Sequence, residues 1–496
     1  MVTRKIHLLI LLSVLISYTI AAYVMVGNLH ADEHFQILEF ANFKRGLIEA
    51  RHLPWEFEAR LRPTIQPTLA LVILEALSVL HLTDPYSQAF ILRLLSALFF
   101  LYSSYALFNA LKSDLSTSWI RYVFLGSTFF LYVFPVIGVR FSSENWCTCF
   151  FMLGFARLYS SLKGIPPKEL TARTVFIVGI LFGLSFLFRY QAAIMLVCLA
   201  LWLLLFHGKQ FRYWLIMLSS FVLIITGGVL FDRWFYGEWA LTAWNYFNAN
   251  LLQGVAASFG VEPWWWYFTT IDFSKWMIFL NGTLIGLIVL FLFTELKNPV
   301  NWVFSLFVLI HCLISHKEIR FLFPVLVFIP YMIARALQTL QSVFKKRRNS
   351  LAILSPLLII NSFAFVACLF RVYDNSHEIH KFIRVLPHKP VVFYYDDTRF
   401  FYALNSGVRD ITPFFYKADN DVIIREMNDN FIQTLTKKKA LKDTLTYVIL
   451  DWNEQEKVAG KLKPVFDPEP EFVKKVDYRN WMRLGPGRWK VFSLNK

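Results

Sequence analysis

Two adjacent carboxylates follow the first long apolar stretch of the chain, in the segment His30-Ala31-Asp32-Glu33. Carboxylates at the mouth of such a stretch are costly near hydrocarbon, and a carboxylate in that place suits a general base that activates a hydroxyl group. In the alternative interpretation, Asp32 caps the helix that follows and Glu33 stabilises its first turn. These four residues alone favour the cap slightly, so the rest of the loop has to decide.

Two arginines later in the same loop, Arg60 and Arg62, are spaced so that an irregular or extended segment points both the same way. This arrangement suits a clamp for a phosphate or pyrophosphate. Anchoring to lipid headgroups is at least as common for two arginines beside a membrane. Trp55, which precedes them, is expected at the membrane interface.

A second charged segment, His316-Lys317-Glu318-Ile319-Arg320, lies between two apolar stretches. Lys317 and Arg320 would donate to a lipid phosphate, with Glu318 orienting one of them. An ordinary charged loop, with His316 satisfied by a neighbour, is the alternative.

Arg140, with Glu144 close behind it, and Arg189 lie in or beside apolar stretches. An arginine within a membrane is a functional hypothesis by default, but structural pairing competes with it. We rank Arg189 below the two charged loops.

Aromatic and amide side chains dominate the segment 232–275, which contains Trp264, Trp265 and Trp266. Such a segment suits a surface helix that holds an isoprenoid chain or stacks on a sugar ring. An interfacial aromatic belt explains the three tryptophans more often than sugar stacking does.

The elements that must position these residues are membrane helices. Of 496 residues, 56% are hydrophobic and 17% charged, and the mean hydropathy is +0.48. This composition excludes a disordered chain, a collagen and a secreted disulfide scaffold. Most of the formal charge of +16 lies in residues 1–371, the apolar part, so a nucleic-acid partner is not needed to explain it.

Eleven apolar stretches are long enough, or nearly so, to span a membrane. They are residues 7–27, 87–111, 118–138, 144–162, 174–188, 190–206, 213–231, 276–294, 299–315, 321–338 and 351–371. A twelfth stretch, 66–82, contains Glu75 and is bounded by prolines. We place it along the membrane surface, because the loop charges then sort cleanly between the two faces.

With eleven spans, the excess of basic residues falls in the cytoplasmic loops, as expected for a membrane protein. These residues are Lys112, Arg121, Lys163, Lys168, Arg173, Lys209, Arg212, Lys297 and 345–348. The other face receives loops 28–86 and 232–275 and the C-terminal segment. Because acids and bases coexist there, we expect the active site on that periplasmic or lumenal face.

Residues 372–496 differ in composition and read as a small extracytoplasmic α/β domain. Strands are expected at Val391–Tyr395, Thr446–Leu450 and Trp489–Leu494, with a helix near 421–436. The five cysteines lie in or beside apolar stretches, which argues against a disulfide framework. Neither a zinc-binding spacing nor a phosphate-binding glycine loop is evident.

Taken together, the charged and aromatic segments resemble the family 22 glycosyltransferases of the GT-C superfamily. Within that family, their order and spacing are closest to those of the glycosylphosphatidylinositol third-mannose transferases. The segments are HADEHFQILEF at 30–40, LPWEFEARLRP at 53–63, RFSSEN at 140–145, FDRWFYGEW through FGVEPWWWYF at 231–268, and HKEIRFLFPVL at 316–326.

The resemblance implies a polytopic α-helical GT-C transmembrane domain, residues 1–371, with juxtamembrane helices in its extracytoplasmic loops. Asp32 looks like the catalytic base and Glu33 like its neighbour in the acceptor site. The expected ligands of the donor phosphate are His316, Lys317, Arg320, Arg60 and Arg62. The expected acceptor or lipid contacts are His30, Gln36, Trp55, Trp264, Trp265 and Trp266.

The implied activity is inverting transfer of mannose from a polyprenyl or dolichyl phosphate to a mannose-containing glycolipid or glycan. The resemblance implies no nucleotide and no obligatory metal, although a carboxylate pair is compatible with a divalent ion. The alternatives are another lipid-phosphate sugar donor and, from a different class, a lipid or sugar transporter. The enzyme would act in a bacterial inner membrane or in the endoplasmic reticulum membrane.

Overall fold

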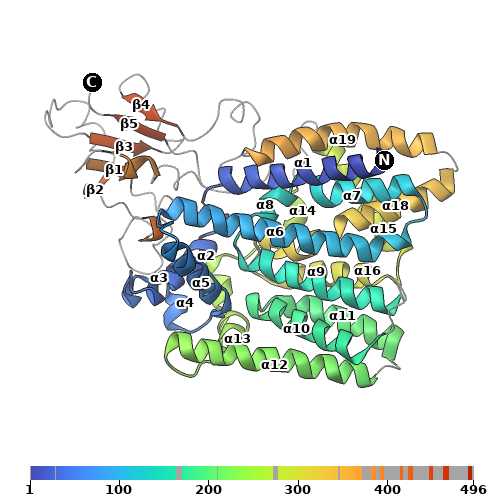
Figure 1. Ribbon diagram of the computed structural model, residues 1–496, viewed down its shortest axis with the longest axis horizontal. Helices are drawn as coiled ribbons and strands as arrows, with labels where there is room; N and C mark the ends of the chain where they lie inside the picture. The colour runs from blue at the N-terminus through green and yellow to red at the C-terminus, as the bar shows by residue number, and fades with distance from the viewer. Residues whose placement is uncertain are drawn as a thin grey trace.

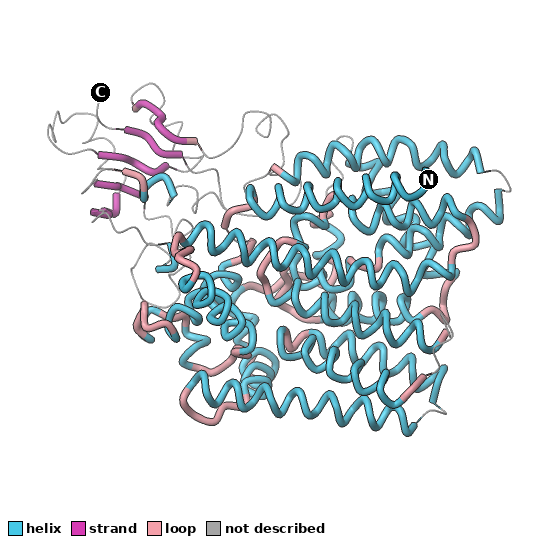
Figure 2. The backbone as a smooth tube through the Cα atoms, viewed as in Figure 1, coloured by secondary structure: helices cyan, strands magenta, loops and turns pink. Residues whose placement is uncertain are grey.

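Long helices lying side by side make up most of the molecule, and the strands form one separate group (Figures 1 and 2). The computed structural model describes residues 2–27, 29–163, 170–208, 211–271, 277–344, 347–370, 381–386, 391–395, 414–416, 423–427, 446–450, 462–467 and 490–493. Asn28, residues 272–275 and most of 372–496, which belong to predicted loops and to the predicted C-terminal domain, lie outside these ranges.

The longer helices account for the predicted apolar stretches. They are α1 (Val2–Val24), α6 (Pro85–Leu111), α7 (Ser118–Phe130), α9 (Ser143–Leu162), α10 (Ala172–Phe188), α11 (Ala192–His207), α12 (Phe211–Tyr236), α15 (Met277–Thr294), α16 (Pro299–Leu313), α18 (Ile329–Phe344) and α19 (Arg347–Leu369). Caps explain where several begin: Asp84 accepts from the Ser87 amide ahead of α6, and Ser142 accepts from the Asn145 amide ahead of α9.

By length and composition, three helical stretches of the described chain could cross a membrane. They are Pro85–Asp114, Phe211–Tyr236 and Met277–Thr294, and a broken pair, Ile319–Leu326 with Ile329–Val343, would be a fourth. Six further apolar helices are shorter: Leu8–Val24, Ile65–Val79, Ala172–Phe188, Ala192–His207, Pro299–Leu313 and Ser355–Leu369. The helical membrane fold is therefore confirmed, whereas the count of eleven spans is not.

Two predicted stretches are broken helices. Residues 118–138 divide into α7 and the short α8 (Phe134–Gly138), and the second stretch divides into η7 (Ile319–Leu322), α17 (Phe323–Leu326) and α18, with a bend of 58° between its halves. Pro135 and Pro330 lie in the first turn of the helix that follows each break. Proline lacks the amide hydrogen that would continue a preceding helix, and it is tolerated in a first turn.

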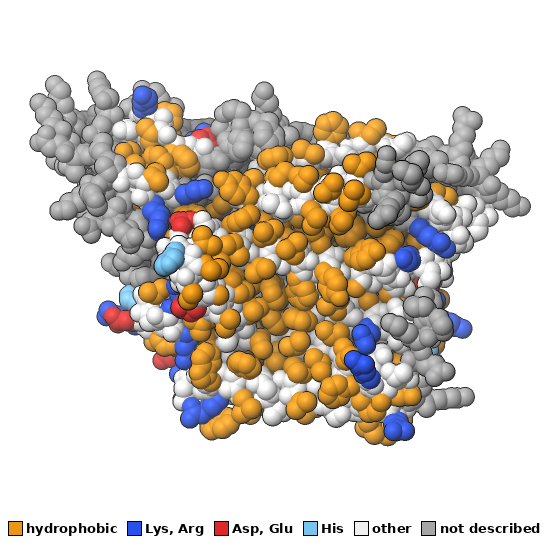
Figure 3. Space-filling model, viewed as in Figure 1, with side chains coloured by type: hydrophobic (Ala, Val, Ile, Leu, Met, Phe, Trp, Pro, Cys, Tyr) orange, Lys and Arg blue, Asp and Glu red, His pale blue; other side chains and the backbone are white. Residues whose placement is uncertain are grey.

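The surface separates into zones that agree with a membrane protein. Figure 3 shows a broad apolar band over the long helices, with Lys and Arg gathered toward one end of it and acidic, basic and histidine side chains together at the other. The mixed end is where α3 (Glu39–Lys44), α4 (Trp55–Glu58) and α5 (Ile65–Val79) gather (Figure 1). Glu75, the acidic residue of the twelfth apolar stretch, pairs there with Arg45 at 2.8 Å.

The described strands of the C-terminal part form one five-stranded sheet of order β2-β1-β3-β5-β4. The strands are β1 (Val391–Tyr395), β2 (Ile423–Met427), β3 (Thr446–Leu450), β4 (Lys463–Phe466) and β5 (Lys490–Ser493). β1 runs parallel to β2 and β3, and β5 runs antiparallel to β3 and β4. The helix expected over 421–436 is wrong at Ile423–Met427, where β-branched residues pair with β1 instead.

Candidate active site

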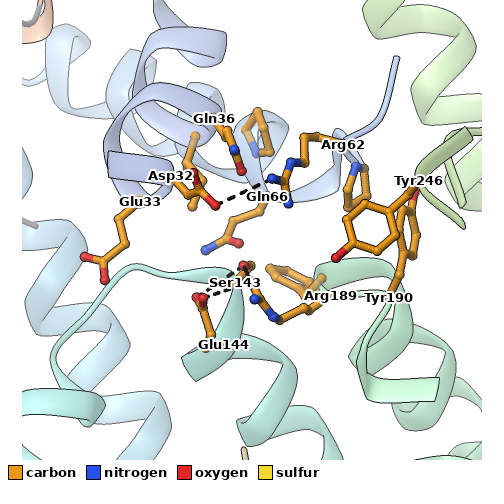
Figure 4. A pocket seen from close by; sticks show the side chains of 14 residues that line it. Asp32, Glu33, Gln36, Arg62, Gln66, Ser143, Glu144, Arg189, Tyr190 and Tyr246 are labelled. Carbon is orange, nitrogen blue, oxygen red and sulfur yellow. Dashed lines mark hydrogen bonds and ion pairs between the residues drawn. The ribbon is translucent and has the colours of Figure 1, made fainter. Parts of the chain in front are cut away.

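A cavity at the mixed-charge end of the bundle brings together residues from five separate parts of the chain. Figure 4 shows Asp32, Gln36, Arg62 and Gln66 converging on it from one side, with Ser143, Glu144 and Arg189 opposite and two tyrosines closing one end. The lining residues are Asp32, Glu33, Gln36, Ile37, Arg62, Pro63, Gln66, Pro67, Ser143, Glu144, Phe188, Arg189, Tyr190 and Tyr246. The adjacent carboxylates Asp32 and Glu33 thus meet Arg62 at one site.

Asp32 lies in the single turn α2 (Ala31–Glu33), whose N-cap is His30. The His30 Nδ1 atom accepts from the Asp32 amide at 3.2 Å, so His30 caps this turn and Asp32 does not. The Asp32 side chain is thereby available to other partners. Its Oδ2 atom lies 2.8 Å from Arg320 Nη2 and 3.5 Å from Arg62 Nη2.

Arg320 is the cation around which the carboxylates assemble. Besides Asp32, its guanidinium contacts Glu144 at 3.1 Å and pairs with Glu318. Glu318 also pairs with His30 and His316. Since Arg320 is only 8% exposed and is surrounded by three carboxylates, its geometry fits the positioning of Asp32 better than the capture of a new anion.

The two adjacent carboxylates have opposite electrostatic environments. Burial alone would raise the pKa of Asp32, but the neighbouring Arg320, His30 and Arg62 outweigh burial and hold that pKa well below its usual value. Burial raises the pKa of Glu33 to about 7, although Arg140, 3.9 Å away, opposes the rise. Asp32 is therefore ionised near neutral pH, whereas Glu33 exchanges a proton there.

Arg62 and Arg189 bring positive charge to opposite sides of the cavity. Arg62 Nη2 lies 3.4 Å from Glu56, which also accepts from Gln36 at 3.0 Å. Arg189 pairs with Glu144 at 2.9 Å and donates to Ser143 at 2.9 Å. Within the described part of the chain, the buried Arg62 Nε and Gln66 Oε1 atoms have no hydrogen-bond partner. A buried donor and acceptor at one cavity indicate a polar ligand.

The segment 232–275, here called the aromatic loop, reaches the cavity through Tyr246. The Arg62 guanidinium lies over the Tyr246 ring, 5.6 Å from its centroid, and the Tyr236 hydroxyl donates to the Arg62 carbonyl at 2.8 Å. Asp232, near the end of α12, accepts from the Thr64 amide and hydroxyl at 2.9 and 2.7 Å. These contacts join the end of α12 and the segment after it to the loop that carries Arg62.

Several predicted site residues do not line the cavity. Arg60 turns away from Arg62 and pairs with Glu238 at 2.7 Å; its φ of 53° explains why the two arginines do not point the same way. Lys317 is 5% exposed and donates to the carbonyls of Glu262 and Ile314. His316 bonds Glu318 and the Gly260 carbonyl.

The tryptophans also lie away from the cavity lining. Trp264 and Trp265 are exposed, and Trp266 and Trp55 are partly exposed. Exposed indoles beside a mixed-charge end fit the interfacial belt better than a sugar platform.

Glu144, Arg189 and Tyr190 are the cavity residues to which the sequence argument gave least weight. Two features of the sequence indicated them: the RFSSEN motif, which contains Glu144, and an arginine, Arg189, between two apolar helices. These features are connected in the structure, because Glu144 pairs with both Arg189 and Arg320. Among the residues that the structure describes, no group of three or more His, Cys, Asp or Glu could hold a metal ion.

Comparison with known proteins now identifies the family. The profile of the Alg9-like mannosyltransferase family matches residues 9–392. The chain belongs to this family. Two features of the structure accompany this family membership. The helical bundle has a polar cavity at one end, and the HADE and HKEIR segments meet beside that cavity through the pair of Asp32 with Arg320.

Among its relatives is a GPI alpha-1,2-mannosyltransferase 3 from Bos taurus, 26% identical over 341 residues, which cover 66% of this chain and 58% of the relative. Mannosyltransferase APTG1 from Arabidopsis thaliana is 25% identical over 304 residues, which cover 60% of this chain and 52% of the relative. The chain thus spans between half and three-fifths of the length of these two relatives.

The fold is shared with ArnT from Cupriavidus metallidurans, whose crystal structure has undecaprenyl phosphate bound. The TM-score is 0.55 at 11% sequence identity, and the match covers 98% of each chain. This likeness shows that the two chains share a fold. The apolar helices of the bundle, three of them long enough to cross a membrane, are those of an integral membrane protein.

Proposed function

We propose that the protein transfers mannose from a polyprenyl-phosphate donor to a mannose-containing glycolipid or glycan. The observation that carries the proposal is the cavity in which ionised Asp32 faces Arg62 and Arg189. Membership of a mannosyltransferase family supports the choice of sugar. The undecaprenyl phosphate bound to ArnT, a protein of the same fold, supports the choice of donor class.

In the proposed reaction, an acceptor hydroxyl attacks the anomeric carbon of the donor mannose. The new bond joins that carbon to the acceptor oxygen, and the bond from the same carbon to the phosphate oxygen breaks. The acceptor proton passes to Asp32, and the electron pair of the broken bond leaves with the polyprenyl phosphate. Attack opposite the leaving group inverts the anomeric configuration.

The cavity supplies a base for the acceptor hydroxyl and cations for the leaving phosphate. Asp32 is a weak base, and it suits a reaction in which the acceptor hydroxyl becomes acidic as the new bond forms. Arg62 and Arg189 would stabilise the phosphate that leaves, because guanidinium groups match its geometry and charge. The Arg62 Nε atom and Gln66 Oε1 would bond a phosphate oxygen and a sugar hydroxyl respectively.

We further propose the arrangement of the chain in the membrane. All eleven apolar stretches cross it, the segment 66–82 lies at its surface, and residues 372–496 form a domain on the periplasmic or lumenal side. The gathering of Lys and Arg at the end of the bundle opposite the cavity supports this orientation (Figure 3). A bacterial inner membrane or the endoplasmic reticulum membrane provides both faces and the lipid donor.

The deciding experiment replaces the base. Asp32→Asn should lower mannose transfer from polyprenyl-phosphate mannose by roughly 100- to 10,000-fold, the usual contribution of a general base. Transfer is measured with purified protein in lipid nanodiscs and a radiolabelled donor. Thermal unfolding of both proteins establishes that the variant is folded.

Asp84→Asn is the matched control. Asp84 caps α6 from an exposed loop, and asparagine caps a helix equally well, so this variant should transfer mannose as the wild type does. Near-normal transfer by folded Asp32→Asn would refute the mechanism. Transfer of a different sugar from its polyprenyl phosphate, without transfer of mannose, would establish the alternative donor.

A further inference from the structure

A three-residue turn from the C-terminal part of the chain, η9 (Phe414–Tyr416), is buried against the helix that follows the catalytic turn. This turn lies beyond residue 392, where the family match ends. Phe415 and Tyr416 are 7% and 3% exposed, and they pack in a cluster that includes Ile37 and Leu38. The C-terminal part therefore contacts the segment that carries Asp32.

Hydrogen bonds through the carboxylate of Glu39 connect the two parts. The Phe415 amide donates to Glu39 Oε1 at 3.0 Å, and the same oxygen lies 2.6 Å from His34 Nε2. Asn42 donates to the other oxygen of Glu39 at 3.2 Å. Glu39 and His34 are 1% and 2% exposed, so the carboxylate is removed from water and bonded on both oxygens.

Contacts between aromatic rings also connect the turn Phe414–Tyr416 to the segment that carries Asp32. The Tyr416 ring stacks on the His34 ring with centroids 5.5 Å apart and an angle of 23° between the planes. The Tyr416 ring also contacts the Tyr86 ring of α6, with centroids 4.8 Å apart. His34 is thus held by a hydrogen bond to Glu39 and by an aromatic ring from the C-terminal part.

The position of His34 makes this contact matter for the active site. His34 is the C-cap of α2, the turn that bears Asp32 and Glu33, and it begins a π-helical turn, His34–Leu38. Gln36 and Ile37 in that turn line the catalytic cavity. A shift of His34 would therefore move the carboxylates and one wall of the cavity together.

We propose that the turn Phe414–Tyr416, acting through Glu39 and His34, is a clamp that positions Asp32 for catalysis. The catalytic consequence rests on the proposed function, since it supposes that Asp32 is the base. Tyr416, Glu39 and His34 are positioning residues, because none of them need touch the substrates. The C-terminal part then contributes to the rate of the reaction and has more than a peripheral role.

The test compares Tyr416→Ala with Tyr416→Phe. Alanine removes the ring that stacks on His34, whereas phenylalanine retains it. Tyr416→Ala should lower kcat on the order of 100-fold, as expected when a catalytic group is misplaced by about 1 Å, with the KM for donor changed less than about twofold. Tyr416→Phe should retain wild-type kcat. Transfer is measured as for the Asp32 variant.

Hydrogen exchange of residues 30–40 supplies a readout that does not depend on activity. Exchange there should rise in Tyr416→Ala and stay at the wild-type level in Tyr416→Phe. If Tyr416→Ala does not fold, Glu39→Gln removes the buried charge that holds His34 with little change of shape, and it should raise exchange over the same residues.

The clamp would be overturned if folded Tyr416→Ala kept wild-type kcat and wild-type hydrogen exchange. The same result in Glu39→Gln would overturn it where Tyr416→Ala does not fold. Equal losses in Tyr416→Phe and Tyr416→Ala would overturn the role of the ring. Failure of the proposed function is distinguishable: the wild type would then not transfer mannose, while the exchange comparison would still test the contact.

Discussion

At the residue scale, Asp32 and Glu33 show how neighbours in sequence acquire different chemistry. Asp32 faces Arg320 and Arg62, and these charges depress its pKa. Glu33 points toward Arg140, 3.9 Å away, and burial raises its pKa to about 7. Pairs of titratable groups whose pKa values are driven apart are typical of acid–base sites, so this divergence agrees with a division of roles between the two carboxylates.

The raised pKa of Glu33 predicts a pH-dependent stability. Its pKa rises from the ordinary 4.5 to about 7 on folding, so the folded protein binds this proton more tightly than the unfolded chain. The resulting stabilisation is complete below about pH 4.5 and is lost as the pH rises through about 7, with a total of roughly 3 kcal/mol. Glu33→Gln stays neutral and should lack this loss.

The measurement is thermal unfolding in nanodiscs between pH 5 and 8. The unfolding temperature of the wild type should fall relative to that of Glu33→Gln as the pH increases. Groups that titrate in both proteins cancel in this difference, which isolates Glu33. Parallel pH profiles for the two proteins would show that Glu33 keeps an ordinary pKa.

The sequence motifs indicated that two residues far apart along the chain, Asp32 and Arg320, lie near each other. Asp32 and Arg320 are 288 residues apart and lie 2.8 Å from each other, as their motifs suggested. Lys317, from the same motif, turns instead to the Glu262 carbonyl, because a side-chain direction depends on local backbone geometry that spacing does not specify. Tyr416 could not be predicted, since its contact with His34 arises only from the packing of a separate segment.

At the element scale, the close contact between α10 and α12 connects the bundle to the site. A Cβ atom at Gly179 of α10 would lie 2.2 Å from the Met217 carbonyl oxygen of α12, so only glycine fits there. Small residues allow membrane helices to approach closely. Because Asp232 of α12 holds Thr64, next to Pro63 of the cavity, the spacing of these helices bears on the position of that loop.

Gly179→Ala should therefore destabilise the protein by roughly 1–3 kcal/mol, the usual cost of overpacking, despite the higher helix propensity of alanine. Transfer activity should also fall, because α12 and Asp232 must shift. The effect is measured by thermal unfolding and by the transfer assay, side by side with wild type.

Gly227→Ala on α12 provides the comparison for this variant. Apart from the helix's own backbone, no atom of the residues that the structure describes lies within 4 Å of a Cβ atom at Gly227. This variant should therefore be as stable as the wild type or more so. If Gly179→Ala and the wild type unfolded at the same temperature, α10 and α12 could move apart without loss of stability, and the prediction would be wrong.

The elements themselves were predictable to different degrees. Apolar runs identify helices such as α6 and α12 because lipid-exposed and buried faces are both apolar. The breaks within 118–138 and 321–338 are less visible, since composition stays apolar through them. At β2 (Ile423–Met427), pairing with β1 determines the structure of a short segment whose pattern also fits a helix.

At the scale of the whole molecule, the distribution of charge supports the proposed orientation of the bundle in the membrane. Lys and Arg gather toward one end, and acids and bases mix at the end that holds the cavity (Figure 3). Basic residues are retained in the cytoplasm during insertion, so the cavity end is expected to face the periplasm or lumen. A lipid-phosphate donor would then be used on that side of the membrane.

Cysteine labelling tests this orientation directly. All five natural cysteines are buried, so background labelling should be low. Ser258 in the aromatic loop and Ser113 at the opposite end are both exposed. In spheroplasts, which expose the periplasmic face, Ser258→Cys should react with a membrane-impermeant maleimide, whereas Ser113→Cys should react only after permeabilisation. In sealed microsomes, whose outer face is cytoplasmic, Ser113→Cys should react first and Ser258→Cys only after permeabilisation. The reverse pattern would place the cavity in the cytoplasm, where Asp32 would meet donors from the other leaflet and the proposed orientation would be wrong.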